Sequence, residues 1–163
     1  MHPILRFLQA LCLVLWLGGM IFFGFVVAPS AFEVLPTRQL AGTLVGTTLY
    51  KLNYISCILL AGFILLTLVD LALESRPRSV RRQILAAAAA VALAMSLYSW
   101  YGIDRRMHAL RTRMDPIETP AVQAPMRAEF DRLHRRSVTF FGVNVGLGLL
   151  MLGLWIRETG QSK

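Results

Sequence analysis

Four apolar runs, each about as long as a bilayer is thick, dominate this sequence. They cover residues 4–28, 54–73, 84–103 and 138–156. A helix needs about 20 predominantly apolar residues to cross the hydrocarbon core of a membrane. The sequence therefore predicts an all-α integral membrane protein, a four-helix up-down bundle whose helix ends extend beyond the bilayer on one side.

The four runs and one long connection account for nearly all of the 163 residues. We therefore expect a single transmembrane domain over 1–163, with no soluble part large enough to fold alone. The first run is longer than the apolar core of a secretory signal peptide, so we interpret it as a retained helix. Cys12 and Cys57 lie inside apolar runs, where we expect them to act as small apolar side chains rather than a disulfide.

Basic residues outnumber acidic ones by 17 to 9, and most lie between or beside the apolar runs. That placement is typical of residues that anchor helix ends and set topology, so we expect the lipid bilayer as partner and no nucleic acid. The sequence predicts a multi-pass protein of a bacterial inner membrane. The cluster of four arginines in the turn at 74–82 favours cytoplasmic termini.

The second helix is predicted to be longer than a bilayer requires. Residues 37–73 contain no proline, and a helix of that length would span about 55 Å. The part at 37–53 is amphipathic, with apolar side chains and one threonine at spacings of three to five: Leu40, Leu44, Val45, Thr48, Leu49 and Leu52. We expect this part to project from the membrane, with Lys51 near the boundary.

Prolines predict the other helix boundaries. The first helix is expected to end near Pro29, with one more short turn after it. The connection at 104–136 carries eight arginines, five acidic residues and two histidines. Residues 104–114 and 126–136 look helical, so the third and fourth helices should continue out of the membrane and join through a turn that contains Pro116, Pro120 and Pro125.

A polar stripe marks the fourth helix. Its residues follow spacings of 4, 3, 4, 3 and 4, which places them on one helix face: Phe130, His134, Ser137, Phe141, Asn144 and Gly148. Asn144 lies about two turns inside the bilayer, where its amide needs a hydrogen-bond partner. We therefore expect the stripe to face the bundle interior.

The third helix offers a similar line of Trp100, Asp104, His108 and Arg111. His108 and His134 should stand at matching heights outside the hydrocarbon, level with Glu33 and Lys51. We hypothesise a ligand-binding pocket at this extramembrane mouth, formed by His108, His134, Asn144, Ser137, Asp104, Glu33 and Lys51.

Three interpretations of the histidines stay open. They can anchor helix ends in the headgroup zone, line a pocket that holds no metal, or bind haem iron or copper through His108 and His134. The third alternative would make the protein a haem- or copper-linked redox or transport protein. No catalytic signature is present, so we expect ligand or partner binding rather than an enzyme.

Several short motifs are spread along the chain. They are 16–19 (Trp-Leu-Gly-Gly), 26–29 (Val-Val-Ala-Pro) with Phe32, the glycines of 41–46, and a fourth-helix signature: Phe130, Leu133, His134, Ser137, Val138 and Asn144. Together they resemble the transmembrane-protein-205-like family, also known as domain of unknown function 4149. This resemblance implies a small four-helix membrane protein without an assigned chemistry.

The opening Trp-x-Gly pattern is also distantly similar to copper-resistance D-type membrane proteins and the J-type protoporphyrinogen oxidase. Those proteins place a histidine about seven residues before the tryptophan, where this sequence has Gln9. We therefore carry over no ligand from them. Finally, the glycine steps of Gly42–Gly46 and of the fourth helix (Gly142, Gly146, Gly148 and Gly153) suggest a homo-oligomer through glycine-rich faces.

Overall fold

The structure is a computed structural model that describes residues 3–73, 80–113 and 120–160. The first of its helical rods has three parts. In it, α1 (Pro3–Phe22) runs into a π-helical segment, η1 (Phe23–Val27), and then into α2 (Ala28–Val34). The rod therefore continues past Pro29, and the prediction that it ends there is wrong.

The π-helical segment explains how the helix passes Pro29. Proline has no N–H to donate and its ring crowds the preceding turn, which normally breaks a helix. The wider π turn lies directly before Pro29, which occupies the first turn of α2. At that position the missing N–H costs least.

The second rod is α3 (Arg38–Leu73), a single helix of 36 residues. This confirms the prediction of one long helix without a break. Its inward face follows spacings of three and four residues: Asn53, Ser56, Leu60, Phe63, Thr67 and Asp70 are all buried. The stripe is apolar in the middle and polar at both ends.

The third rod comprises α4 (Val80–Tyr98), the π-helical segment η2 (Ser99–Asp104) and α5 (Arg105–Arg113). As predicted, it continues beyond its apolar part. The fourth rod, α6 (Pro120–Gly160), is one helix of 41 residues that includes Pro125, so placing that proline in a turn was wrong. Pro125 is the sixth residue of α6, so its missing N–H removes one intrahelical hydrogen bond close to the start of the helix. Pro116 and most of the predicted turn at 74–82 lie outside the described residues.

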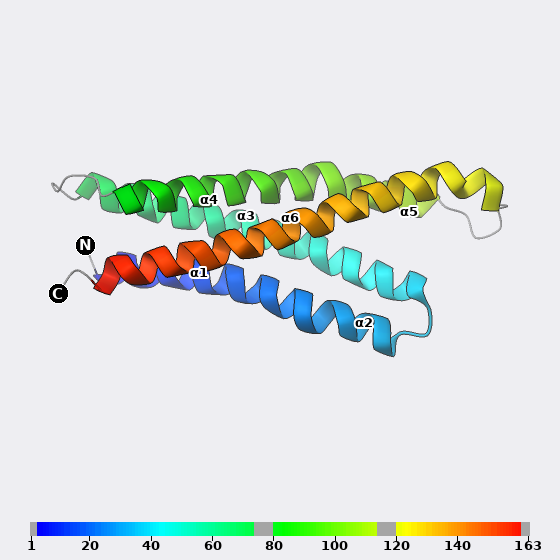
Figure 1. The fold of residues 1–163 in the computed structure, drawn as a ribbon, viewed down its shortest axis with the longest axis horizontal. Coiled ribbons are helices and arrows are strands. Elements are labelled where there is room, and N and C mark those ends of the chain that lie inside the picture. The colour runs from blue at the N-terminus through cyan, green and yellow to red at the C-terminus, as the bar shows by residue number, and fades with distance from the viewer. Residues whose placement is uncertain (1–2, 74–79, 114–119, 161–163) are drawn as a thin grey trace.

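The rods form an up-down bundle in which neighbours in sequence are neighbours in space. Helix α1 packs on α3, α3 on α4, and α4 on α6, and the ring closes between α6 and α1. Figure 1 shows α1 beginning and α6 ending at the same end of the bundle. At the opposite end, the α2–α3 pair diverges from the α5–α6 pair, and we call the region between them the fork.

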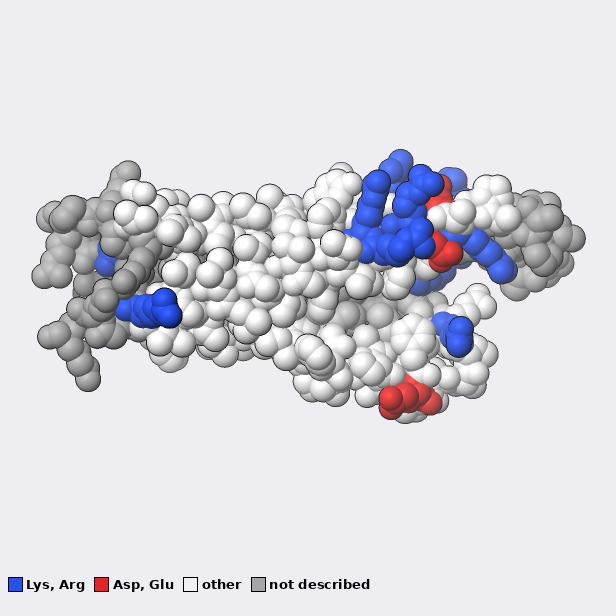
Figure 2. Space-filling model, in the orientation of Figure 1, with Lys and Arg blue, Asp and Glu red and all other residues white. Residues whose placement is uncertain are grey.

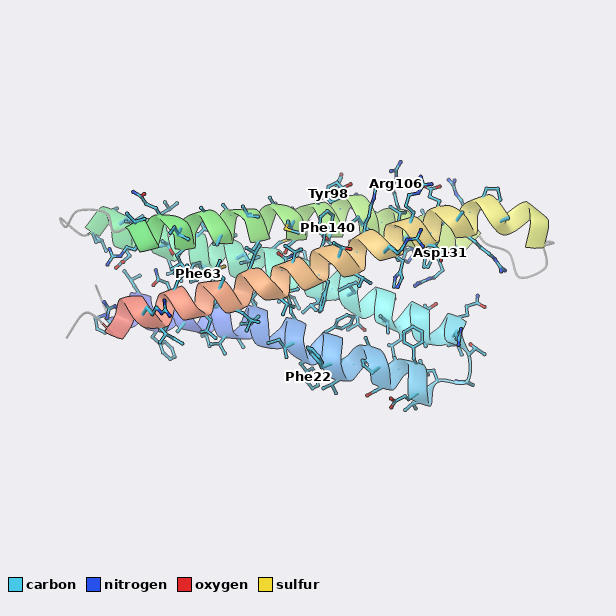
Figure 3. All side chains as sticks on the ribbon, in the orientation of Figure 1. Phe22, Phe63, Tyr98, Arg106, Asp131 and Phe140 are labelled. Atoms are coloured by element: carbon cyan, nitrogen blue, oxygen red, sulfur yellow. The ribbon has the colours of Figure 1, made fainter. Side chains whose placement is uncertain are left out.

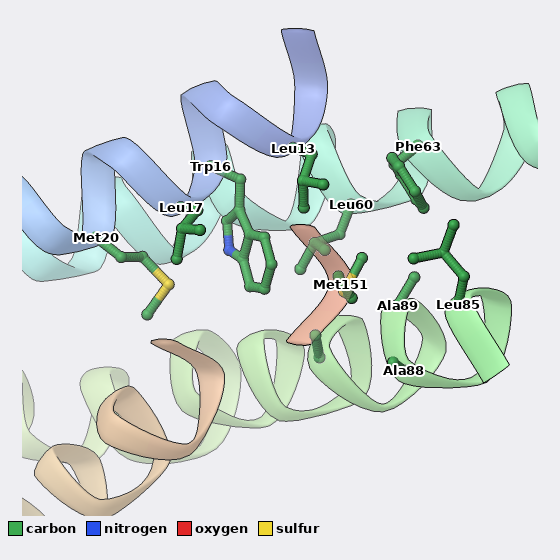
Figure 4. Close-up of a cluster of buried hydrophobic side chains, with 11 residues drawn as sticks. Leu13, Trp16, Leu17, Met20, Leu60, Phe63, Leu85, Ala88, Ala89 and Met151 are labelled. Atoms are coloured by element: carbon green, nitrogen blue, oxygen red, sulfur yellow. The ribbon is translucent and has the colours of Figure 1, made fainter. Parts of the chain in front are cut away.

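The apolar core lies toward the end where α1 begins. Trp16 and Phe63 are each 1% exposed, and they face a run of alanines on α4 of which Ala89 and Ala92 are fully buried. Figure 4 shows these side chains meeting between the helices, with Met151 of α6 completing the cluster. The small alanines allow α4 to approach closely enough to cover the large rings.

All four rods are long and apolar enough to span a membrane: Pro3–Val34, Arg38–Leu73, Arg82–Arg113 and Ala124–Arg157. Large apolar side chains such as Phe25, Leu65 and Leu150 face outward, as lipid contact requires. Figure 2 shows a long uncharged stretch of surface that ends at a cluster of basic side chains near the fork. The chain is an integral membrane protein whose helices extend beyond the apolar stretch on the side of the fork.

Candidate functional site

A buried polar pair closes the base of the fork. Nδ2 of Asn53 on α3 donates a hydrogen bond of 2.8 Å to Oδ2 of Asp104 at the end of η2. The two residues are only 6% and 8% exposed. Burying a carboxylate costs several kcal/mol unless hydrogen bonds replace its water. The pair therefore joins α3 to the third rod where the apolar bundle ends.

Aromatic rings surround this pair. Tyr50 and Tyr54 lie on either side of Asn53 along α3, and their ring centroids are 6.1 and 5.3 Å from that of Trp100. The indole Nε1 of Trp100 is buried and has no hydrogen-bond partner among the residues that the structure describes. The base of the fork is thus a desolvated polar layer with aromatic rings at its edge.

One cation crosses the fork. The guanidinium of Arg111 on α5 lies 5.2 Å above the ring of Phe130 on α6 and reaches toward the glycines of α3. A β-carbon at Gly42 would lie 3.7 Å from its Nη2, whereas one at Gly46 would lie 2.7 Å from its Nη1. Within the described residues, Arg111 has neither a hydrogen bond nor an ion pair. Its positive charge is thus held by an aromatic face in a half-buried position.

A pocket of about 350 Å³ opens between α5 and α6 at this end of the bundle. It is lined by Arg106 of α5 together with residues on one face of α6: Pro125, Ala128, Glu129, Arg132, Leu133 and Arg136. Three of these lining residues are arginines and one is acidic. We call this feature the arginine pocket. Figure 2 shows the surrounding concentration of basic side chains.

The two histidines do not face the interior. Both His108 and His134 are exposed, and no contact between their rings is seen in the described parts of the chain. The prediction that His134 belongs to the inward stripe is wrong, because its neighbour Leu133 occupies that face. His134 instead stacks on Phe130 with the two ring planes 4° apart.

Helix geometry explains the position of His108. The inward line of the third rod runs through Ile103 and Met107 toward Arg111, and successive residues of a helix point about 100° apart. His108 therefore turns away from the line that Met107 follows. The π-helical segment η2 lies directly before α5 and uses more residues per turn, which also shifts the register of everything after it.

The other predicted residues separate into two groups. Asp104, Ser137 and Asn144 are buried, as expected for the bundle interior. Nδ2 of Asn144 donates to Oγ of Ser96 over 3.3 Å, so its amide joins α6 to α4 deep in the apolar part. In contrast, Glu33 and Lys51 are exposed on the α2–α3 pair. The structure therefore does not gather the seven predicted residues into one pocket.

Asn53 was not among the residues predicted for the site, and no binding role was predicted for the arginines of the pocket. The signal for Asn53 was present, since it begins the regular stripe on α3 that ends at Asp70. The arginines lacked such a signal, because basic residues beside apolar runs ordinarily anchor helix ends.

The described residues contain no group of three or more His, Cys, Asp or Glu side chains that could hold a metal ion. Cys12 and Cys57 lie within the apolar part of the bundle. The exposed positions of His108 and His134, on the surfaces of α5 and α6, do not fit a shared haem or copper site.

Comparison with known proteins places the chain in a family. Residues 11–116 match the domain of unknown function DUF4149. The chain belongs to this family. The match begins within α1, continues through the second and third rods and ends before α6, so it includes Asp104 and Arg106 but not Arg132 or Arg136. No curated protein and no solved structure matched the chain.

Proposed function

We propose that this membrane protein binds an acidic molecule, one that carries a phosphate or carboxylate group, in the arginine pocket at the extramembrane end of its bundle. The observation that carries the proposal is the pocket itself. Arg106, Arg132 and Arg136 converge on one opening with a single opposing acid, Glu129.

The chemistry of arginine supports this assignment. A guanidinium presents a planar set of N–H donors that matches the oxygens of phosphate and carboxylate, and it stays charged at any physiological pH. The three arginines carry like charges and line one pocket, so they repel each other. A bound anion would offset this repulsion between α5 and α6. The volume of about 350 Å³ falls at the lower end of the range for small-molecule sites, which is about 300–1,000 Å³.

A thermal-shift experiment on the purified full chain in detergent tests this function. Inorganic phosphate and pyrophosphate should raise the unfolding temperature relative to chloride at the same ionic strength, because a ligand that binds only the folded state stabilises it. Arg132→Gln should clearly reduce the increase.

Arg135→Gln is the matched control, because Arg135 is an exposed neighbour on α6 that does not line the pocket. It should keep the full phosphate-dependent increase. Equal losses in both variants, or no increase with the unaltered protein, would refute the proposal.

The alternative of a haem- or copper-linked protein that uses His108 and His134 has no structural observation in its favour. It stays a prediction, as do the likeness to the transmembrane-protein-205-like and copper-resistance D-type proteins, the bacterial inner membrane, the cytoplasmic termini and the homo-oligomer. A Soret-region absorption spectrum and metal analysis of the purified protein test the haem or copper alternative directly.

A further inference from the structure

The arginine pocket continues into an aromatic surface on the lipid-facing side. Arg136 lines the pocket, and Phe140 follows it by four residues on the same face of α6. The ring of Phe140 meets that of Tyr98 on α4 edge-on, with centroids 5.6 Å apart. Figure 3 shows Tyr98 and Phe140 at the level of the apolar bundle and Arg106 farther toward the fork.

This surface is open to the surroundings. Tyr98 is 52% exposed and Phe140 is half-buried. These residues belong to the apolar stretch that lies in the bilayer, since residue 138 begins the last apolar run. The pocket and the aromatic pair thus form one continuous feature that is charged at the membrane surface and apolar below it.

Membrane lipids with a charged headgroup have the same division of charge and apolar surface at the same depth. We propose that the arginine pocket holds the phosphate-bearing headgroup of an anionic phospholipid, whose acyl chain lies along Phe140 and Tyr98. This inference rests on the acidic-ligand function proposed above and names the ligand class. Basic pockets between membrane helices recognise anionic headgroups by the same physics.

The charge of the pocket favours an anionic over a zwitterionic lipid. Both kinds carry a phosphate, but a zwitterionic headgroup also brings an ammonium group close to the arginines. Each arginine near an anionic membrane surface contributes about 1 kcal/mol of attraction, which corresponds to about a fivefold change in affinity. The exposed aromatic rings supply the apolar contact for the acyl chain.

Native mass spectrometry of the full chain tests the inference. The protein is reconstituted in vesicles of equal parts phosphatidylcholine and phosphatidylglycerol, extracted in mild detergent, and its retained lipids are counted. The unaltered protein should retain phosphatidylglycerol in preference to phosphatidylcholine. Arg106→Gln and Arg132→Gln should each lower that preference about fivefold, whereas Arg135→Gln, with the same loss of charge outside the pocket, should not.

A second arm examines the acyl chain. Tyr98→Ala removes an exposed ring of the aromatic surface, so it should reduce phosphatidylglycerol retention and leave the phosphate-induced thermal shift unchanged. If the thermal shift depends on Arg132 but the protein shows no lipid preference, the lipid inference fails and the proposed function stands. If neither signal occurs, both fail. A preference that Arg135→Gln lowers as much as Arg132→Gln would indicate diffuse surface charge and overturn the pocket as a lipid site.

Discussion

Nη1 of Arg111 lies only 2.7 Å from the position that a β-carbon of residue 46 would occupy. The missing side chain on α3 makes room for a cation from α5, and Phe130 of α6 holds that cation from the other side. Arg111 thereby links three helices at the point where the two helix pairs diverge. An arrangement of this kind makes the effect of a substitution at Gly46 depend on Arg111.

Gly46→Ala should have opposite consequences in two backgrounds. Replacing a helical glycine by alanine normally stabilises a helix by about 0.5–1 kcal/mol. With Arg111 present, the new methyl group displaces the guanidinium and forfeits a cation–π contact worth about as much. The gain should therefore appear in an Arg111→Ala background and vanish in the unaltered protein, as measured by unfolding in detergent.

Gly42→Ala serves as the control for this cycle, because its β-carbon would make an ordinary contact with Arg111 at 3.7 Å. It should stabilise both backgrounds alike. Equal gains from Gly46→Ala in both backgrounds would contradict the role of Arg111 as a link across the fork.

Two glycines of α6 should respond in opposite ways to alanine. A β-carbon at Gly148 would lie 2.7 Å from Cδ1 of Leu17 and 3.2 Å from Cζ3 of Trp16, both in the buried core. Gly148→Ala should therefore lower stability by about 1–3 kcal/mol through overpacking. Gly146 has open space around it, and Gly146→Ala should be neutral or slightly stabilising. Thermal unfolding in detergent compares them, and a similar response of both would show that α6 packs differently.

Removing one partner of the Asn53–Asp104 pair should lower stability more than replacing both partners by apolar residues. Asn53→Leu leaves a buried carboxylate without its 2.8 Å hydrogen bond, which should lower the free energy of unfolding by about 1–3 kcal/mol. The double variant Asn53→Leu with Asp104→Leu removes both polar groups and should recover most of that loss. Unfolding measurements on the two variants provide the comparison. A double variant less stable than Asn53→Leu alone would mean that Asp104 has a further partner.

The four-span topology predicts labelling from opposite faces. In a background without Cys12 and Cys57, single cysteines at Gln83 and Thr112 should react with an impermeant maleimide from opposite sides of the membrane. Both positions are exposed and lie near the two ends of the third rod. Labelling of both from one side would remove the four-span arrangement, and the accessible side would establish the orientation of the termini.

Much of the site lay beyond sequence reasoning for a geometric reason. On α6, Leu133 and His134 are both within one turn of the buried Ser137, so either could have continued the inward stripe. The apolar leucine takes the interior and the histidine is left outside. On the third rod, the π-helical segment shifts the helix register before α5, and the sequence of that segment did not predict the shift. The predicted histidine pair depended on both registers.

Hydropathy determined the four-helix bundle, and the absence of proline from 37–73 determined the unbroken α3. Transfer into the bilayer is favourable for each apolar residue at any position in a span. The four helices and the unbroken α3 therefore follow from the sequence alone. The choice of inward face follows from competition between neighbouring side chains for limited space. The convergence of Arg106 with Arg132 and Arg136 requires α5 to pack on α6. The position of Arg111 requires Gly46 on α3. Only the tertiary structure decided these features, because each depends on residues from different helices meeting at one depth.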